Sequence, residues 1–482
     1  MSDAGGATQE SLQQLIDRTP DLVEHFSNDA PAPHFARSGS RSAAFIPPAF
    51  TNWRDEQTAW DETAALFHQS HHMPELFLSG PDALRLLEHL GINSVANFTT
   101  DRAKQYVVCA PSGHVIGDCI AYRLGEDRFE LVSGMPLQDW VAYSAETGDW
   151  DVEVVRDAPS NINPTGGRTN FRFQLDGPAA QDVFREVVEG DLPEIGFFRT
   201  ATVRIAGVDV LVLRHGMAGH RGVELSGPFA QESRVRDAIL SVGAEHGIKP
   251  VGTSAYFSTP LSNAWMAYPV PAIFTGEELR GFREWLPGDG WEARTELGGS
   301  FRSPNIEDYY ATPYDLGYGN IVKFDHDFIG REALEGIAPE QRRTKVSLVW
   351  NRDDVARVLA SQFGPGPRYK SIEMPVAYYA WNQFDEVRSA SGEFAGVSCH
   401  AGYLNPEGEL LSLAMLHHGH ATIGDEVVLT WGEPDGGSRK PQVERHEQTT
   451  IRATVAPAPY ASSVQRMMRA GASAPTSAGV TA

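Results

Sequence analysis

The chain has 482 residues, 41% of them apolar, and a formal net charge of −23 at pH 7. This length exceeds a single hydrophobic core and predicts roughly two to four domains, while the negative charge argues against a nucleic-acid partner, which would need clustered cations. Apolar runs stay below the ~20 residues that span a bilayer, and three cysteines without paired spacing suit a reducing compartment, so we expect a cytoplasmic protein without a membrane segment.

The N-terminal part of the chain predicts a helical extension followed by strands and helices in alternation. Apolar residues near helical spacing from Leu12 to Phe26 predict a helix that Pro20 divides. Further along, a strand, a Ser-Gly-Pro turn and a leucine-rich helix are predicted over 75–90. Three β-rich segments then follow: Tyr106–Ala110, Val115–Arg123 and Phe129–Val132.

The unit of strand, Gly-Pro turn and helix recurs twice in the middle of the chain. Phe171–Leu175 precedes a helix predicted over 179–188, and Gly222–Leu225 precedes one over 229–242. This alternation predicts α+β layers and not a doubly wound sheet. After Gln341 helices become scarce, and short apolar segments predict a small barrel or sandwich: Val346–Trp350, Gly396–His400, Leu411–Leu416, Glu426–Trp431 and Thr450–Val455.

Several motifs resemble the aminomethyltransferase (glycine-cleavage T-protein) family. They are Ser70-His-His-Met73 before Ser79-Gly-Pro-Asp-Ala-Leu84, then Thr312-Pro313, Gly317-Tyr-Gly319 and Phe328-Ile-Gly-Arg-Glu-Ala-Leu334. The resemblance implies tetrahydrofolate as cofactor and a three-lobed ring, in which two ferredoxin-like folate-binding lobes are joined by a C-terminal β-barrel. The domains it implies are an N-terminal helical extension (1–30), a folate-binding region (31–340, with one lobe over 61–160 and the other over 31–60 plus 161–340), the barrel (341–465) and a disordered tail (466–482).

Asp118 and Tyr106 are the first candidates for the folate site. A carboxylate at the start of an apolar strand is unusual without a partner, although Asp118 could also be a turn aspartate that caps the preceding glycine. In the family, a tyrosine-bearing strand and a Gly-x-x-x-x-Asp run lead into the folate site. The resemblance therefore assigns Tyr106 to cofactor binding and places Asp118 beside the reactive pterin nitrogen.

Glu224 and Gln174 are the second pair of candidates. Gly222-Val-Glu-Leu225 matches a family segment in which the glutamate holds the amino-pyrimidine edge of the pterin. Gln174, on the strand Phe171–Leu175, is a plausible amide neighbour, but a solvent-facing strand position is a nearly equal alternative.

The segment Gly252-Thr-Ser-Ala-Tyr256, with Trp265 nine residues beyond it, departs from the T-protein pattern. Where most T-proteins carry an Arg-Asp pair, this chain has Ser254 and Tyr256. At this segment, and over almost its full length, the chain resembles the tetrahydrofolate-dependent aryl O-demethylases of lignin-aromatic catabolism. Those enzymes act on syringate, vanillate and 3-O-methylgallate. The resemblance implies cofactor contact by Trp265 and chemistry at Tyr256.

A methyl ether of a phenol needs a proton on its oxygen as the bond to methyl breaks. A tyrosine hydroxyl, with an unperturbed pKa of about 10, is nearly matched to that leaving group, which favours Tyr256 as general acid. His72 would orient the substrate or relay the proton, and Asp118 would offset charge on the pterin. Gly134 stands where vanillate-type relatives carry a carboxylate-binding arginine, which favours syringate and leaves Arg123 and Arg283 as possible carboxylate partners.

Three other functions remain open at this point. One is a glycine-cleavage aminomethyltransferase, which would dock an acidic lipoyl carrier that a chain of −23 is not expected to bind. Another is a non-catalytic folate-binding protein. The third is a demethylase of a non-aromatic donor such as dimethylsulfoniopropionate, which would need an aromatic cage for a cation. No metal ion is expected in any of these.

Overall fold

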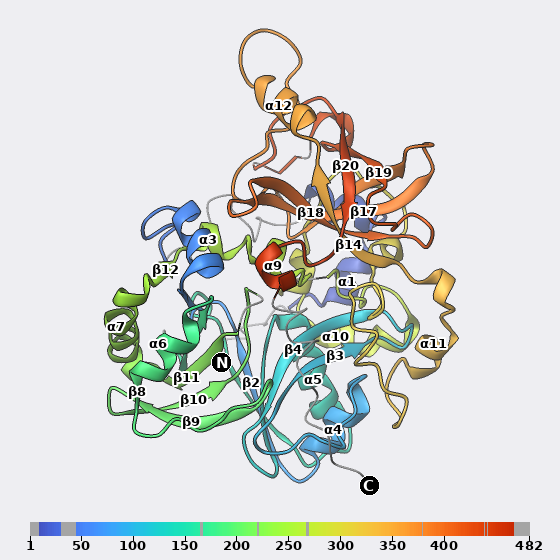
Figure 1. Cartoon of the computed structure of the whole chain (residues 1–482). Helices are drawn as coiled ribbons and strands as arrows, with labels where there is room; N and C mark the ends of the chain where they lie inside the picture. Colours follow the sequence, from blue (N-terminus) through green and yellow to red (C-terminus); the bar gives the residue numbers. More distant parts are fainter. Residues whose placement is uncertain are drawn as a thin grey trace, which may run out of the picture.

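The computed structural model describes residues 9–29, 45–163, 167–218, 221–266, 269–377, 379–437, 439–440 and 442–466. Three lobes lie around a common centre (Figure 1): a seven-stranded sheet with its helices, a five-stranded sheet with its helices, and a closed barrel. The α+β class and the C-terminal barrel predicted from the sequence are thereby confirmed. In the described part of the chain, no helix has both the length and the apolar character needed to cross a membrane.

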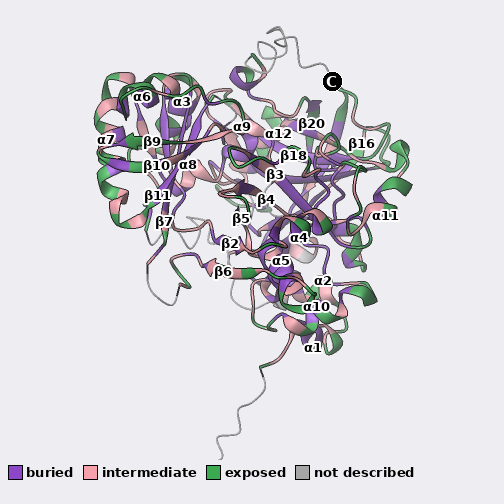
Figure 2. Cartoon of the chain, turned by 90° about the horizontal axis from the view of Figure 1, so that it is seen from below, coloured by how far each residue is buried: buried purple, intermediate pink, exposed green. Residues whose placement is uncertain are grey.

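The seven-stranded sheet forms the first lobe and has the order β12-β1-β7-β11-β10-β9-β8. Helices α6 (Ala180–Val187) and α7 (Glu232–Gly243) pack against each other and, with the sheet, bury one apolar core (Figure 2). The strands are β1 (Ala65–His68), β7 (Asn170–Asp176), β8 (Val188–Glu189), β9 (Thr200–Ile205), β10 (Val208–Leu213), β11 (Val223–Pro228) and β12 (Lys249–Val251).

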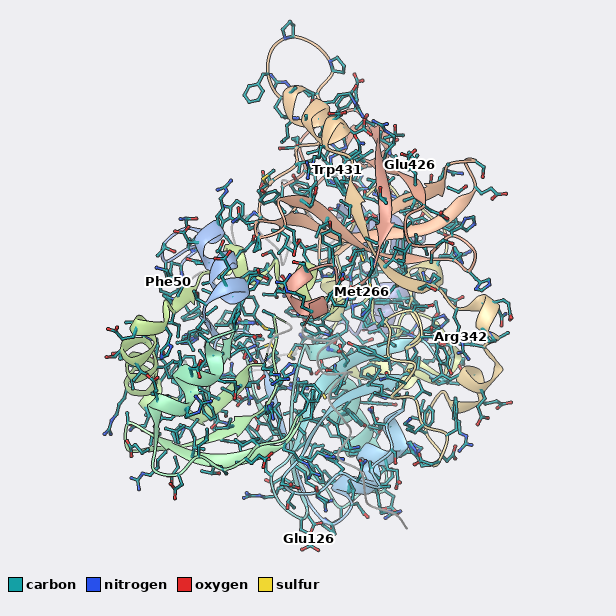
Figure 3. All side chains as sticks on the ribbon, viewed as in Figure 1. Phe50, Glu126, Met266, Arg342, Glu426 and Trp431 are labelled. Carbon is teal, nitrogen blue, oxygen red and sulfur yellow. The ribbon has the colours of Figure 1, made fainter. Side chains whose placement is uncertain are left out.

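The five-stranded sheet forms the second lobe and has the order β3-β4-β5-β2-β6. Its core also receives helices α4 (Ala83–Leu90) and α5 (Met135–Thr147). The far tip of this lobe is the turn that carries Glu126 (Figure 3). The strands are β2 (Glu75–Ser79), β3 (Ala103–Cys109), β4 (Val115–Arg123), β5 (Arg128–Ser133) and β6 (Glu153–Asp157).

The barrel is closed by six strands in the order β14-β18-β17-β16-β19-β20, which decides between the barrel and the sandwich. Trp350 and Trp431 fill its interior with ring centroids 5.2 Å apart. Helix α12 (Arg352–Ala360) lies outside it (Figure 1). The strands are β14 (Thr344–Trp350), β16 (Asp385–Ser389), β17 (Phe394–Leu404), β18 (Glu409–Leu416), β19 (Glu426–Trp431) and β20 (Thr449–Ala456).

The connecting elements join the lobes and shape the centre. At the N-terminus, α1 (Leu12–Asp17) and α2 (Leu22–Glu24) are separated around Pro20 as predicted, and both pack on the core of the five-stranded lobe. The other connecting elements are η1 (His25–Asp29), α3 (Trp53–Glu62), η3 (Phe229–Gln231), η4 (Ala244–His246), α8 (Thr253–Tyr256), α9 (Thr259–Asn263), η5 (Glu277–Leu279), α10 (Arg280–Trp285), η6 (Glu292–Arg294), η7 (Ile306–Tyr309), α11 (Arg331–Gly336), η8 (Pro339–Gln341), η9 (Pro434–Gly436) and the short pair β13 (Leu297–Gly298) with β15 (Asn382–Gln383).

Two predicted lobe assignments differ from the structure. Strand β1 was assigned to the lobe over 61–160, yet it pairs with β7 and β12 and so belongs to the seven-stranded lobe. Conversely, apolar residues between Ala264 and Leu334 pack into the core of the five-stranded lobe and not of the other one. The reason is that strand pairing and docking are long-range contacts, which local periodicity does not encode. Apart from Arg466, the predicted tail lies outside the described residues.

Candidate active site

A cavity of about 480 Å³ lies where the three lobes meet. The five-stranded lobe contributes Asp118 and Gly134 to its wall, and the seven-stranded lobe contributes Glu224. Connecting segments add Tyr256, Trp265 and Tyr318, and the C-terminal part of the chain adds Trp381, Pro459 and Val464. Most of the surface is apolar, so the few polar groups on it are the ones that can orient a ligand.

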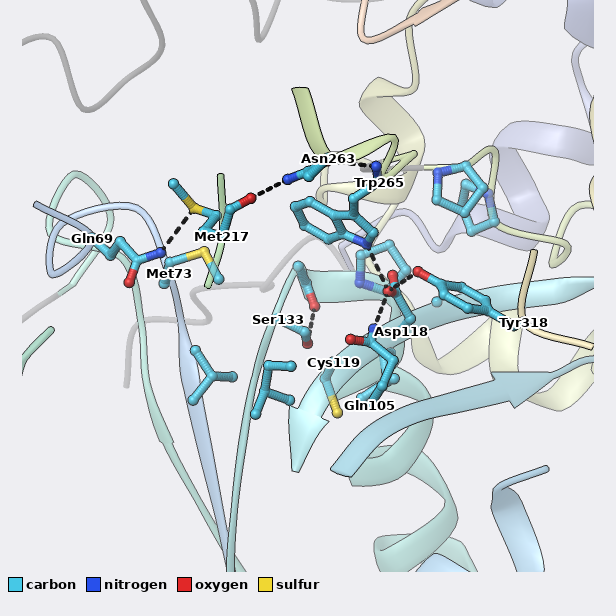
Figure 4. A pocket seen from close by; sticks show the side chains of 18 of the residues that line it. Gln69, Met73, Gln105, Asp118, Cys119, Ser133, Met217, Asn263, Trp265 and Tyr318 are labelled. Carbon is cyan, nitrogen blue, oxygen red and sulfur yellow. Dashed lines mark hydrogen bonds between the residues drawn. The ribbon is translucent and has the colours of Figure 1, made fainter. Parts of the chain in front are cut away.

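The Asp118 carboxylate in the cavity wall accepts three side-chain hydrogen bonds (Figure 4). Its Oδ2 accepts hydrogen bonds from Gln105 Nε2 at 2.5 Å, Tyr318 Oη at 2.8 Å and Trp265 Nε1 at 3.0 Å. Burial raises the pKa of Asp118, and the bonds from Trp265 and Tyr318 partly offset that rise. All three side-chain donors meet Oδ2 and none meets Oδ1. The raised pKa makes the carboxylate a better proton acceptor.

Trp265 is held in place by the backbone of the residues before it. Ala264, at the end of α9, has a positive φ of 60°, a conformation that costs energy for a residue other than glycine. Asn263 accepts a hydrogen bond from the Trp265 backbone N–H at 2.6 Å and donates one to the carbonyl of Met217 (Figure 4). This strained turn fixes the indole against Asp118.

Tyr256 and His72 form the second polar pair of the site. The Tyr256 hydroxyl lies 2.9 Å from His72 Nε2, and the two rings meet edge to face. Tyr256 lines the cavity, whereas His72 lies behind it. Burial of the imidazole is the main cause that lowers the pKa of His72 to about 3, so His72 is neutral at physiological pH and can either donate to or accept from the phenol.

Glu224 lies at the end of a buried ion cluster that joins the two sheets. Arg172, on β7, meets Glu224 at 2.5 Å and Glu75 at 3.0 Å, and it also meets Glu130. Tyr122 donates a hydrogen bond to Glu224. Since Glu75, Glu130 and Tyr122 belong to the five-stranded lobe, this guanidinium holds both lobes and fixes the Glu224 carboxylate at the wall of the cavity.

Two buried amides, that of Gln174 opposite Glu224 in the sheet and that of Gln69 in the cavity wall, have oxygens without a hydrogen-bond partner among the described residues. Gln174 donates to the His215 carbonyl at 2.8 Å, and its Oε1 is unsatisfied. It packs so close to Gly222 that a Cβ there would lie 2.6 Å from its Nε2. Gln69 lines the cavity, donates to the Met217 sulfur at 3.2 Å, and likewise leaves Oε1 unsatisfied. Such buried acceptors are suited to a ligand that brings N–H donors.

The structure thus brings Asp118, Glu224, Tyr256, Trp265 and Gly134 to one cavity, with His72 and Gln174 directly behind its wall. It does not bring Tyr106 there. The Tyr106 hydroxyl donates to the Leu87 carbonyl at 2.7 Å, and its ring fills the space above Gly91 in the core beneath α4. The predicted cofactor contact of Tyr106 is therefore replaced by a packing role, because its side chain points to the opposite face of β3 from Gln105.

Sequence reasoning missed several residues of the site. Tyr318 lies in the Gly-Tyr-Gly motif that supported the resemblance, and its role follows only from its contact with Asp118, 200 positions away. The links from Arg172 to both lobes, the cavity-facing amide of Gln69 and the position of Arg294 in the wall likewise depend on long-range packing. Arg123 and Arg283 hold backbone carbonyls outside the cavity instead of serving it.

The fold and a large part of the sequence are those of the glycine-cleavage T-protein class. The chain matches the GCVT N-terminal domain over residues 27–269, and its structure resembles the crystal structure of aminomethyltransferase T from Bartonella henselae with a TM-score of 0.57, covering 89% of this chain and 94% of that one at 17% identity. The chain belongs to this aminomethyltransferase superfamily.

Within the superfamily, similarity to an O-demethylase and to a methylene transferase extends over nearly the whole chain. The chain is 43% identical to syringate O-demethylase of a Sphingobium species, across 93% of this chain and 96% of that protein. It is 30% identical to sesamin methylene transferase of a Sinomonas species, across 88% and 92%. The matches to aminomethyltransferases are shorter, for example 29% identity over 62% of this chain for the Lysinibacillus sphaericus protein.

Proposed function

We propose that this protein transfers the methyl group of an aromatic methyl ether to tetrahydrofolate, releasing a phenol and 5-methyl-tetrahydrofolate. The observation that carries the proposal is the joint placement of the Tyr256–His72 pair and the Asp118 carboxylate in one largely apolar cavity. Full-length similarity to syringate O-demethylase supports the same reaction class.

The cavity fits a reduced pterin on chemical grounds. A pterin presents N–H donors along its amino-pyrimidine edge, and Glu224, Asp118 and the unsatisfied Oε1 of Gln69 are acceptors in or at the wall. Trp265 and Tyr318 offer aromatic surface beside Asp118. When bound, tetrahydrofolate supplies a secondary-amine nitrogen that accepts the methyl group.

The residues of the chain account for both proton movements of the transfer. As the bond between the ether oxygen and the methyl carbon breaks, the Tyr256 hydroxyl delivers its proton to that oxygen, so the product leaves as a neutral phenol. Neutral His72 then stabilises the tyrosinate by donating a hydrogen bond from Nε2. Asp118 accepts the proton that the amine loses. Fixing both reactants in this geometry supplies up to roughly 7–11 kcal/mol of the barrier.

Syringate is the substrate that we favour, with vanillate and 3-O-methylgallate as related possibilities. Gly134 lines the cavity at the beginning of α5 and has no side chain, which leaves room for a second methoxy group. We further propose that the protein acts in the cytoplasm, in the catabolism of lignin-derived aromatics. All three cysteines are buried and free, which is consistent with a reducing compartment.

The test is an anaerobic incubation of the purified protein with tetrahydrofolate and, separately, syringate, vanillate, 3-O-methylgallate and dimethylsulfoniopropionate. We expect 5-methyl-tetrahydrofolate and the demethylated phenol in equal amounts from one or more of the aromatic ethers. In Tyr256→Phe, kcat should fall about 10²- to 10⁴-fold, the usual contribution of a general acid. Tyr403→Phe, which removes the same hydroxyl from a ring that packs on Trp53 away from the cavity, should retain activity. Lack of transfer from every aromatic ether would refute the proposal, and full activity in Tyr256→Phe would refute the acid.

A further inference from the structure

The cavity carries one cation among its described lining residues, the guanidinium of Arg294 at the end of η6. His215 also lines it, but burial lowers the pKa of that imidazole, which favours the neutral form. The net charge of the chain is −23, so a cation in this largely apolar cavity is unusual. A guanidinium near apolar walls is stabilised by an anionic partner, and we therefore expect an anion that Arg294 meets.

The carboxylates of the cavity do not serve as that partner. Asp118 meets Gln105, Trp265 and Tyr318, while Glu224 meets Arg172 and Tyr122. Glu296 interacts with Lys440, whose pKa it helps to keep from falling further. Within the described part of the chain, the Arg294 guanidinium forms neither an ion pair nor a hydrogen bond. Each acid is thus engaged elsewhere.

We infer that Arg294 binds the carboxylate of the aromatic substrate, an inference that rests on the proposed function. An arginine presents a planar pair of N–H groups that matches a carboxylate. This places the carboxylate subsite at the turn that carries η6. Trp291 and Trp381 line the same cavity and provide aromatic surface for the benzene ring.

A second source of a carboxylate is the glutamate tail of the folate, and the location of Arg294 favours the smaller acid. Its neighbours in sequence are buried, Ala293 fully and Thr295 with 8% exposure, and Arg294 itself is half-buried. The rim is marked instead by Phe197, a lining residue with 71% exposure. A folate tail has to leave the cavity toward solvent, whereas a benzoate can end inside it.

The experiment compares syringate with 2,6-dimethoxyphenol, the same arene without its carboxylate, in the full-length protein and in Arg294→Met. A charge-assisted pair of this kind corresponds to about 10- to 100-fold in affinity. We expect wild type to favour syringate by about that factor in kcat/KM, Arg294→Met to lose the preference, and Arg294→Lys to restore part of it. KM for tetrahydrofolate should not change. Arg234→Met, on the exposed face of α7, is the matched control.

Binding provides a readout that does not depend on turnover. Quenching of tryptophan fluorescence by syringate without folate should give a Kd that rises in Arg294→Met by the same factor, while that for 2,6-dimethoxyphenol stays constant. A preference for syringate that survives in Arg294→Met would overturn the inference. An increase in Arg294→Met that is confined to the KM of tetrahydrofolate would also overturn it and would assign Arg294 to the folate tail. Failure of wild type to demethylate any ether refutes the proposed function instead, and the binding titration still decides the role of Arg294.

Discussion

Replacing Arg172 by methionine should weaken the contact between the two sheets and lower the stability of the protein, because its guanidinium pairs with carboxylates of both lobes. The side chain is 1% exposed and reaches carboxylates on three different strands of the two lobes. Methionine fills much of the same space but removes the charge. Glu75, Glu130 and Glu224 would then face one another in a buried setting without their cation.

The expected cost follows from what remains after the substitution. Removing one partner of a buried ion pair typically costs about 3–5 kcal/mol, since an uncompensated charge stays in a low dielectric. Burial already raises the pKa of Glu130, with Glu75 and Glu224 raising it further and Arg172 opposing the rise. Loss of Arg172 therefore raises the pKa of Glu130 further, so the destabilisation should be largest above neutral pH and smaller in mild acid, where this carboxyl holds a proton.

Thermal unfolding monitored by circular dichroism at pH 6 and pH 8 measures the effect. At about 2–4 °C per kcal/mol for a unit of lobe size, the first transition of Arg172→Met should fall by roughly 6–20 °C at pH 8 and by less at pH 6. Arg185→Met, which breaks an exposed pair with Asp182, should shift the transition by no more than a few degrees. A shift in Arg172→Met as small as that control, or one that grows toward pH 6, would refute the reasoning.

Two further predictions concern protons at the site. Tyr318→Phe removes a hydrogen bond that lowers the pKa of Asp118, so the acid limb of the pH–kcat profile should move to higher pH. Tyr403→Phe is the control. An unchanged acid limb in Tyr318→Phe would show that the protonation of Asp118 does not limit the rate. His72→Phe should weaken the pH dependence of stability. His72 has a folded pKa of about 3 against 6.5 for the free imidazole, so wild type loses stability as the pH falls from 6.5 toward 3. The midpoint of thermal unfolding should thus drop less between pH 7 and pH 5 in His72→Phe, and equal drops in both proteins would contradict this assignment.

Local elements of this fold were largely predictable from the sequence. Val115–Arg123 forms a strand with the predicted bounds, as does Glu426–Trp431, because both are short, rich in β-formers and bounded by turn residues. Helix α5 was missed for a physical reason. Its residues 137–142 are all buried, so no polar stripe alternates with an apolar one to indicate a helix.

Residues of the site could be predicted only where they belong to a sequence motif of the family. Asp118, Glu224, Tyr256 and Trp265 were found because the resemblance assigned them, and the structure brings all four together. Arg172, by contrast, is an arginine in an apolar strand, and its partners Glu75, Glu130 and Glu224 are 97, 42 and 52 positions away. Such a cluster depends on which strands of the two sheets come into contact, which no local pattern specifies.

The cavity wall has a consequence for how this protein can be divided. The stretch that matches the GCVT N-terminal domain ends at residue 269, but Trp381, Pro459 and Val464 line the cavity from far beyond it. A product truncated before residue 459 would keep Asp118, Glu224 and Tyr256 yet lack part of the enclosure that keeps water from them. Exchanging the C-terminal part of the chain as a separate module would therefore open the cavity, because Trp381, Pro459 and Val464 flank the barrel strands and belong to the cavity wall.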